Sequence, residues 1–200
     1  MTKSPSDLRP ILAALKRHGL LLKQDPTLPS VVGIVTGEAL RTSWWNHPQN
    51  KKIFALLEAL EDREDVLETK LLGKVTFVFE SLWAAWLGVA IGGEGWQRTG
   101  LSVAAEHLLA EVERAGECEA SGATVKELEA RLLVRTSQRH TPSGHHVLVL
   151  EGWQRWAERV AVTPLPIAAA MSALETATAA LGARVSLLPW QRARRRQRKA

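Results

Sequence analysis

Two stretches of strand-forming residues, 71 residues apart, constrain the fold of this chain most strongly. Residues 66–79 and 134–150 are rich in β-branched and aromatic residues. Each stretch is interrupted by a glycine turn, and this pattern predicts a β-hairpin. A shift of 71 residues places Gly73 on Gly144. Few identities accompany the shift, so the shared order of elements carries the argument. That order predicts two related units, each with its own hairpin.

Amphipathic patterns predict helices ahead of the first hairpin. Apolar residues at helical spacing begin at Leu8, and Asn46 with Gln49 has the spacing of a capping box at a helix start. The predicted elements are a helix at 8–19, a strand at 31–35, a short helix at 37–45, a helix at 46–61 and, after the hairpin, a helix from Ser81.

The second half of the chain repeats this plan. Residues 92–95, Gly-Gly-Glu-Gly, predict the linker between the units. Thr124 and Glu127 form a second capping-box pattern. The predicted helices lie at 101–116, 124–133, 153–160 and 167–182. The domains therefore comprise a first unit at 1–91, a second unit at 96–162, a C-terminal helix at 163–183 and a basic tail at 184–200.

Composition limits the class of protein. Eight tryptophans and no tyrosine predict a tryptophan-rich core, with the pairs Trp83/Trp86 and Trp153/Trp156 at helical spacing. A single cysteine excludes an internal disulfide. The first ten residues lack the apolar run of a signal peptide, and no apolar stretch is long enough to span a bilayer. We therefore expect a cytoplasmic protein without a membrane partner. Its expected fold is mainly α with small β-hairpins, in the α+β class.

The predicted element order resembles that of a known superfamily. Helix, short strand, two helices and a hairpin is the order of a winged-helix domain. The chain resembles a tandem winged-helix protein over about residues 7–160. The resemblance implies two winged-helix units that bind duplex DNA, with the third helix in the major groove and the wing on the backbone or minor groove. Other tandem members bind protein, as do the chromosome-segregation partners of condensin, or are DNA glycosylases. The architecture leaves these alternatives open.

Positive charge is concentrated at the C-terminus. The formal net charge is +5, but the last ten residues hold six cations and no acid, which leaves −1 for the first 190 residues. A localised run of cations predicts affinity for a polyanion without sequence specificity. We also expect residues 191–200 to be mobile. The cations are Arg192, Arg194, Arg195, Arg196, Arg198 and Lys199.

The second hairpin is the strongest candidate for a nucleic-acid site. No acid occurs between Arg135 and His146. In a strand, Arg135, Ser137, Arg139 and Thr141 would share one face. Arginine and hydroxyl donors in a row are suited to phosphate oxygens. The alternative is an ordinary exposed hairpin with solvated charges. The candidate residues of this hairpin are Arg135, Ser137, Arg139, His140, His145 and His146.

No catalytic or metal-binding signature accompanies these residues. The histidine spacing matches no zinc pattern, and Cys118 lies far from the histidines along the chain. Ser143 lacks the surroundings of a catalytic nucleophile. We therefore expect no metal, no cofactor and no enzymatic activity.

The first unit offers weaker candidates. Gln49, Lys51 and Lys52 lie near the start of the expected third helix, where an amide could read a base edge and lysines could contact phosphates. Trp44 and Trp45 are interpreted as core residues. The sequence thus predicts a non-enzymatic DNA-binding protein, whether a regulator, a nucleoid component or a repair accessory.

Overall fold

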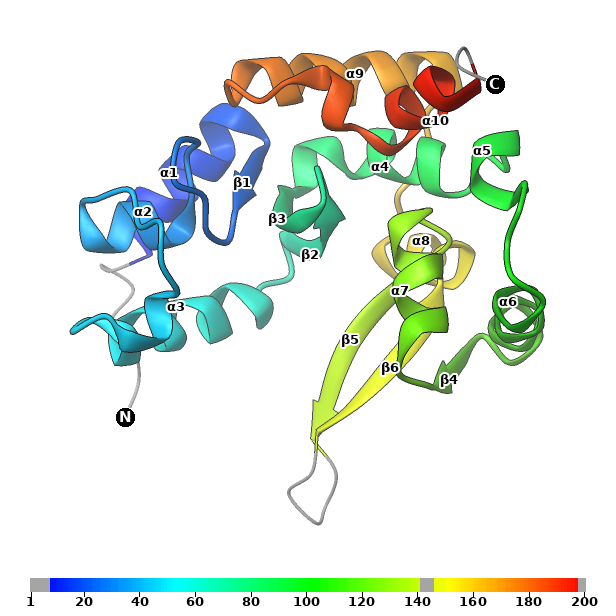
Figure 1. Ribbon diagram of the computed structural model, residues 1–200, viewed down its shortest axis with the longest axis horizontal. Coiled ribbons are helices and arrows are strands. Elements are labelled where there is room, and N and C mark those ends of the chain that lie inside the picture. Colours follow the sequence, from blue (N-terminus) through cyan, green and yellow to red (C-terminus); the bar gives the residue numbers. More distant parts are fainter. Residues whose placement is uncertain (1–7, 141–145, 198–200) are drawn as a thin grey trace. The chain divides into compact units, whose positions relative to one another are not determined.

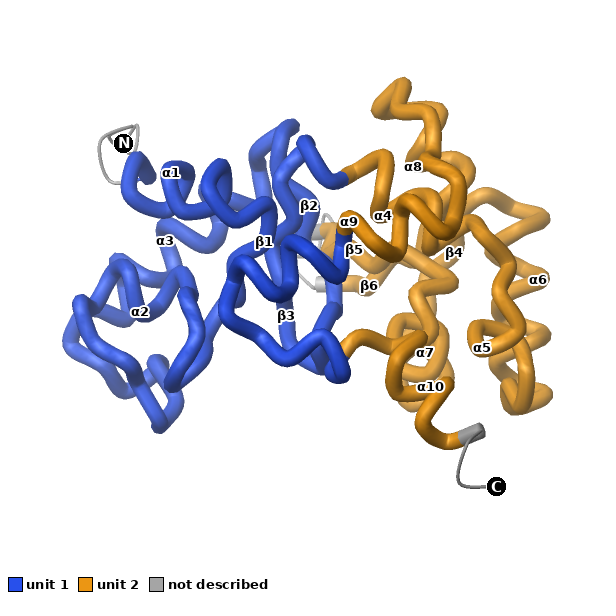
Figure 2. Tube along the Cα trace, turned by 90° about the horizontal axis from the view of Figure 1, so that it is seen from above, with its two compact units in different colours: residues 1–82, 174–187 blue, residues 83–173, 188–200 orange. Residues whose placement is uncertain are grey.

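Two compact units make up the chain. The computed structural model describes residues 8–140 and 146–197. Figure 2 colours the first unit, Met1–Leu82 with Leu174–Leu187, in blue and the second, Trp83–Ala173 with Leu188–Ala200, in orange. Each unit contains a three-stranded antiparallel sheet among helices (Figure 1). The predicted α+β class, rich in helix and with small hairpins, is confirmed.

The first unit packs three helices against its sheet. Sheet order is β1-β3-β2, with Leu21 opposite Phe77. Apolar faces of α1, α2 and α3 form one buried cluster with the sheet, including Ile11, Val32 and Ile53. The elements are α1 (Arg9–His18), β1 (Leu20–Leu22), α2 (Val31–Thr36), η1 (Trp44–Asn46), α3 (Asn50–Glu61), β2 (Val66–Leu71), β3 (Lys74–Phe79) and η2 (Glu80–Leu82).

Three predictions for this unit are wrong. The short strand is β1 and not 31–35, because Gly19 at φ +71° ends α1 and leaves the next residues to pair with β3. Residues 31–36 are helical because the Ser30 hydroxyl accepts a hydrogen bond from the Gly33 amide and caps the helix. Residues 37–43 form no helix. The third helix begins at Asn50, and its capping residue, Gln49, makes no side-chain cap.

A cluster of ionisable groups lies beside β2. The Lys23 ammonium is 3.8 Å from the Glu61 carboxylate and 4.0 Å from that of Glu68. Burial raises the pKa of Glu68 to about 7; Lys23 opposes this shift, and the adjacent Glu61 carboxylate reinforces it. Glu68 therefore keeps its proton in the folded chain at a pH where the unfolded chain has lost it.

The Glu68 shift predicts a pH-dependent stability. Between pH 4.5, the ordinary pKa of the group, and about pH 7, the folded state holds more protons than the unfolded state. The free energy of unfolding should therefore fall as the pH rises through this window. We expect a fall of about 1 kcal/mol, which is less than the full pKa shift implies, because a third of the Glu68 side chain is exposed and solvent screens its charge. Urea unfolding across this range measures the fall, and Glu68→Gln should remove it. An equal fall in the variant would assign it to other groups.

The second unit holds the other sheet, of order β4-β6-β5. Helices α6 and α7 bury Ala105, Val112 and Leu128 against it. The elements of this unit are α4 (Trp83–Ala90), α5 (Gly95–Arg98), α6 (Val103–Ala115), β4 (Glu117–Glu119), α7 (Ala123–Ala130), β5 (Val134–His140), β6 (His146–Gly152), α8 (Trp153–Val160) and α10 (Pro189–Gln197). The residues of α9 (Ile167–Ala180) are divided between the two units, and η3 (Val185–Leu187) belongs to the first.

Tryptophans join α4 to α8 within this unit. Trp83 packs edge-on against Trp156 at 5.0 Å between ring centroids, and Trp86 packs against Trp153 at 5.4 Å. All four side chains are buried. The prediction that these pairs are core residues is confirmed, and the two pairs contact each other.

Several boundaries in this half differ from those expected. The units divide between Leu82 and Trp83 and not at 92–95, where Glu94 and Gln97 form a capping box on α5. Glu127 makes no box with Thr124; its carboxylate instead accepts hydrogen bonds from the amide and hydroxyl of Ser102, at 3.0 and 2.7 Å, where α6 begins.

The C-terminal segment, which the sequence analysis describes as a basic tail, forms a helix. Helix α10 extends to Gln197. Leu188 and Trp190 are fully buried at its start, which offsets the repulsion between its arginines. Within the part of the chain that the structure describes, no helix is long and apolar enough to cross a membrane.

Candidate nucleic-acid interface

One face of the second sheet carries the predicted arginines. The register sets Arg135 opposite Glu151 and Ser137 opposite Val149. Alternate residues of a strand share a face, so Arg135, Ser137 and Arg139 lie together. Val134, on the opposite face of the strand, belongs to the buried core.

Arg135 shares a buried carboxylate with an arginine of α8. Glu151 is 3% exposed. Its Oε2 accepts from Arg135 Nη1 at 3.2 Å and from Arg159 Nη2 at 2.8 Å, and its Oε1 accepts from Arg159 Nη1. Burial lowers the pKa of Arg135, and the Glu151 carboxylate opposes this shift. Glu151 therefore holds two guanidinium groups in fixed positions.

A second carboxylate holds two more guanidinium groups. Glu117 Oε1, on β4, accepts from Arg139 Nη2 at 3.0 Å, and Glu117 Oε2 lies 3.9 Å from Arg155 Nη2 on α8. The hydrogen bond from Arg139 lowers the pKa of Glu117, and the positive charges of Arg155 and Arg159 lower it further. We call the four arginines, Arg135, Arg139, Arg155 and Arg159, with Glu117 and Glu151, the arginine face.

The arginine face has more cations than anions. Four guanidinium groups share two carboxylates, and they still outnumber the acids if Glu119, on the same side of β4, is included. Arg139, Arg155 and Arg159 are about half exposed, at 53, 49 and 52%. A guanidinium has five donors, so each retains N–H groups for an outside acceptor. Oriented arginines of this kind suit phosphate oxygens, often through paired hydrogen bonds.

The sequence prediction for this hairpin needs correction. Its arginines are not free of acids, since β4 and β6 supply Glu117 and Glu151. Arg135 is 25% exposed and bound to Glu151, so Arg139, Arg155 and Arg159 are better placed than Arg135 to contact an outside phosphate. Arg155 and Arg159 were missed, although their i, i+4 spacing on a helix was a usable signal. His145 and the side chains of His140 and His146 lie outside the described residues.

Helix α10 presents further arginines. Arg192, Arg195 and Arg196 are exposed and, at i, i+3 and i+4, share one face of the helix. The Arg194 guanidinium lies 3.9 Å from the sulfur of Met171 on α9. Arg198 and Lys199 lie outside the described residues. The six predicted tail cations thus include three on a single helical face.

In the first unit, the candidate residues surround an exposed aromatic pair. Lys51 and Lys52 are exposed in the first turn of α3, and Gln49 is half-buried just before it. Trp44 is buried as expected, but Trp45 is 58% exposed and contacts Phe54, itself 45% exposed, at 6.1 Å between ring centroids. The prediction of Trp45 as a core residue is wrong, and Phe54 was missed.

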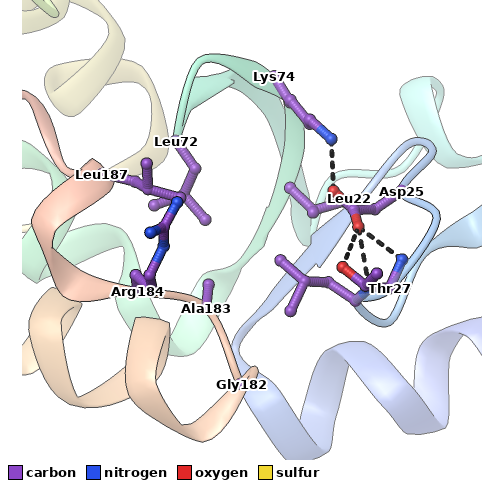
Figure 3. Close-up of a pocket in the computed structure, with 10 residues that line it drawn as sticks. Leu22, Asp25, Thr27, Leu72, Lys74, Gly182, Ala183, Arg184 and Leu187 are labelled. Carbon is purple, nitrogen blue, oxygen red and sulfur yellow. Dashed lines mark hydrogen bonds and ion pairs between the residues drawn. The ribbon is translucent and has the colours of Figure 1, made fainter.

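A pocket in the first unit is an alternative candidate for the functional site. Figure 3 shows its lining, with Asp25 beside Lys74 and Thr27. The Asp25 carboxylate accepts hydrogen bonds from the amides of Thr27 and Leu28 and is 2.5 Å from the Lys74 ammonium. These bonds fully engage the carboxylate, so the pocket presents a structural ion pair and not a free reactive group.

The described residues contain no group of three or more side chains placed to hold a metal ion. No known protein family, curated protein or solved structure matches this chain.

Proposed function

We propose that the protein is a cytoplasmic, non-enzymatic DNA-binding protein that contacts the phosphates of duplex DNA through the arginine face of its second unit. The observation that carries the proposal is the set of half-exposed guanidinium groups, Arg139, Arg155 and Arg159, oriented by two carboxylates. Phosphate contacts of this kind fix a protein on DNA without reading sequence. The arginines of α10 would add affinity in the same way.

The order of elements in the first unit also supports the proposal. Helix α1, strand β1, helices α2 and α3 and the β2–β3 hairpin follow one another as in a winged-helix domain. In that architecture the third helix enters the major groove. Here the third helix is α3, and its exposed residues Lys51 and Lys52 lie in its first turn.

Removing two cations from the arginine face should weaken duplex binding. We expect Arg139→Gln combined with Arg155→Gln to lower affinity for any duplex sequence and to reduce the slope of log K against log salt by about two, because two phosphate contacts are lost. Fluorescence anisotropy with a labelled duplex at several salt concentrations measures both.

A matched variant controls for general loss of charge. Arg98 on α5 is 54% exposed and donates to Glu113 at 2.7 Å, so Arg98→Gln removes one cation that is as exposed as Arg139 and, like it, hydrogen-bonded to a glutamate. It should leave the salt slope unchanged. The proposal would be overturned, in favour of a protein-binding module, if the wild type, the double variant and Arg98→Gln gave equal salt slopes. It would also be overturned if the wild-type chain did not bind duplex DNA.

A further inference from the structure

The first unit has exposed aromatic residues that form a second candidate surface. Trp44 covers one side of the Trp45 indole, with ring centroids 4.1 Å apart and planes inclined by 23°. Trp45 is nevertheless 58% exposed, so its other side and edge face solvent. Phe54, one turn into α3, adjoins it. We call Trp45 and Phe54 the aromatic platform.

Hydrogen bonds hold the platform in place. The Trp45 amide donates to the Ser43 hydroxyl at 3.4 Å, and the Asn50 side chain donates to the Trp45 carbonyl at 2.8 Å. The His47 amide, two residues after Trp45, donates to the Trp44 carbonyl at 3.0 Å. Because the backbone is fixed on both sides of the indole, a ligand could stack on it without first ordering the segment.

Cations beside the platform indicate the chemistry of its ligand. Lys51 precedes Phe54 by three residues and so lies on the same face of α3, while Lys52 follows Lys51 in the same first turn of the helix. Among the residues that the structure describes, neither Lys51 nor Lys52 makes an ion pair. A flat aromatic surface flanked by free cations suits a nucleotide, whose base stacks while its phosphate meets the ammonium groups. An apolar protein surface would desolvate these lysines without compensation.

We propose that Trp45 and Phe54 stack on unpaired nucleobases of single-stranded nucleic acid while Lys51 and Lys52 contact its phosphates. This inference rests on the proposed nucleic-acid function and extends it to a second, base-dependent site in the first unit.

An abasic strand separates stacking from phosphate contacts. The probes are a labelled oligothymidine of about twelve nucleotides and an abasic strand of the same length, since such sites span roughly 4–16 nucleotides. Trp45→Ala should weaken oligothymidine binding about tenfold and leave abasic binding nearly unchanged, because only the bases stack. Phe54→Ala should act in the same direction, and Trp45→Phe should retain most of the affinity. Val103→Ala, at a 69% exposed apolar residue of the second unit, is the control.

Three outcomes would overturn the proposal. In the first, the wild-type chain does not bind oligothymidine at all. In the second, Trp45→Ala weakens oligothymidine and abasic binding equally. In the third, the wild-type chain is a dimer in sedimentation velocity and Trp45→Ala dissociates it. The last would assign the surface to a second copy of the chain. Duplex binding measured in parallel keeps the two proposals distinct, because the arginine-face variants can lose duplex affinity whether or not Trp45 matters.

Discussion

Glu151→Gln is expected to destabilise the second unit by about 3–5 kcal/mol, because Glu151 is the only counter-charge of the largely buried Arg135 among the described residues. Arg135 bonds Glu151 through Nη1, and its Nε is buried without a hydrogen-bond partner among the described residues. The glutamine keeps the size of the side chain but cannot neutralise Arg135 and Arg159. Circular dichroism should record a fall in melting temperature of about 10 °C.

The matched control for this change is Glu117→Gln. Glu117 also bridges two arginines, but its side chain is 38% exposed, and water can replace its contacts. The melting temperature should therefore change little. Equal melting temperatures for Glu151→Gln and the wild type would contradict a structural role for the buried carboxylate.

Trp190→Ala is the second change with a large expected effect. Trp190 is fully buried at the start of α10 and lies 6.3 Å from Trp96 between ring centroids. Truncating a buried tryptophan to alanine costs about 3–5 kcal/mol. We expect a lower melting temperature and a loss of helical signal, since Trp190 is the larger of the two fully buried residues, with Leu188, that anchor the arginine-rich turns of α10.

Trp45→Ala provides the comparison for Trp190→Ala. It makes the same substitution at an indole that is 58% exposed, so much less apolar area is lost from the folded state. Its melting temperature should remain close to that of the wild type. Similar losses in both variants would show that α10 does not depend on its buried tryptophan.

The sequence predicted the hairpins and the tryptophan core because these depend on local pattern. Strand-forming residues on both sides of a turn specify the β2–β3 and β5–β6 pairs. The register also follows, since Arg135 and Glu151 are equidistant from Ser143. The pairing of these two residues was therefore predictable from the turn. The acid-free run of residues 135–146 does not reveal this pairing by itself, because Glu151 lies beyond the end of the run.

Tertiary contacts decide the elements that the sequence analysis placed wrongly. Three consecutive leucines, 20–22, suit a helix or a strand equally, and pairing with β3 selects the strand. Helix α10 forms because Leu188 and Trp190 find a buried site, which a run of arginines does not reveal. Trp44 and Trp45 are adjacent and identical, and only the folded chain distinguishes the buried from the exposed ring.

Arginine footprinting tests the central claim most directly. Phenylglyoxal modifies accessible guanidinium groups, and mass spectrometry gives the rate at each site. Saturating duplex DNA should slow modification of Arg139, Arg155 and Arg159, which are about half exposed in the free chain, while Arg98, equally exposed on α5, continues to react at its original rate. Unchanged rates at the arginine face in the presence of bound duplex, or protection equal to that of Arg98, would contradict the account.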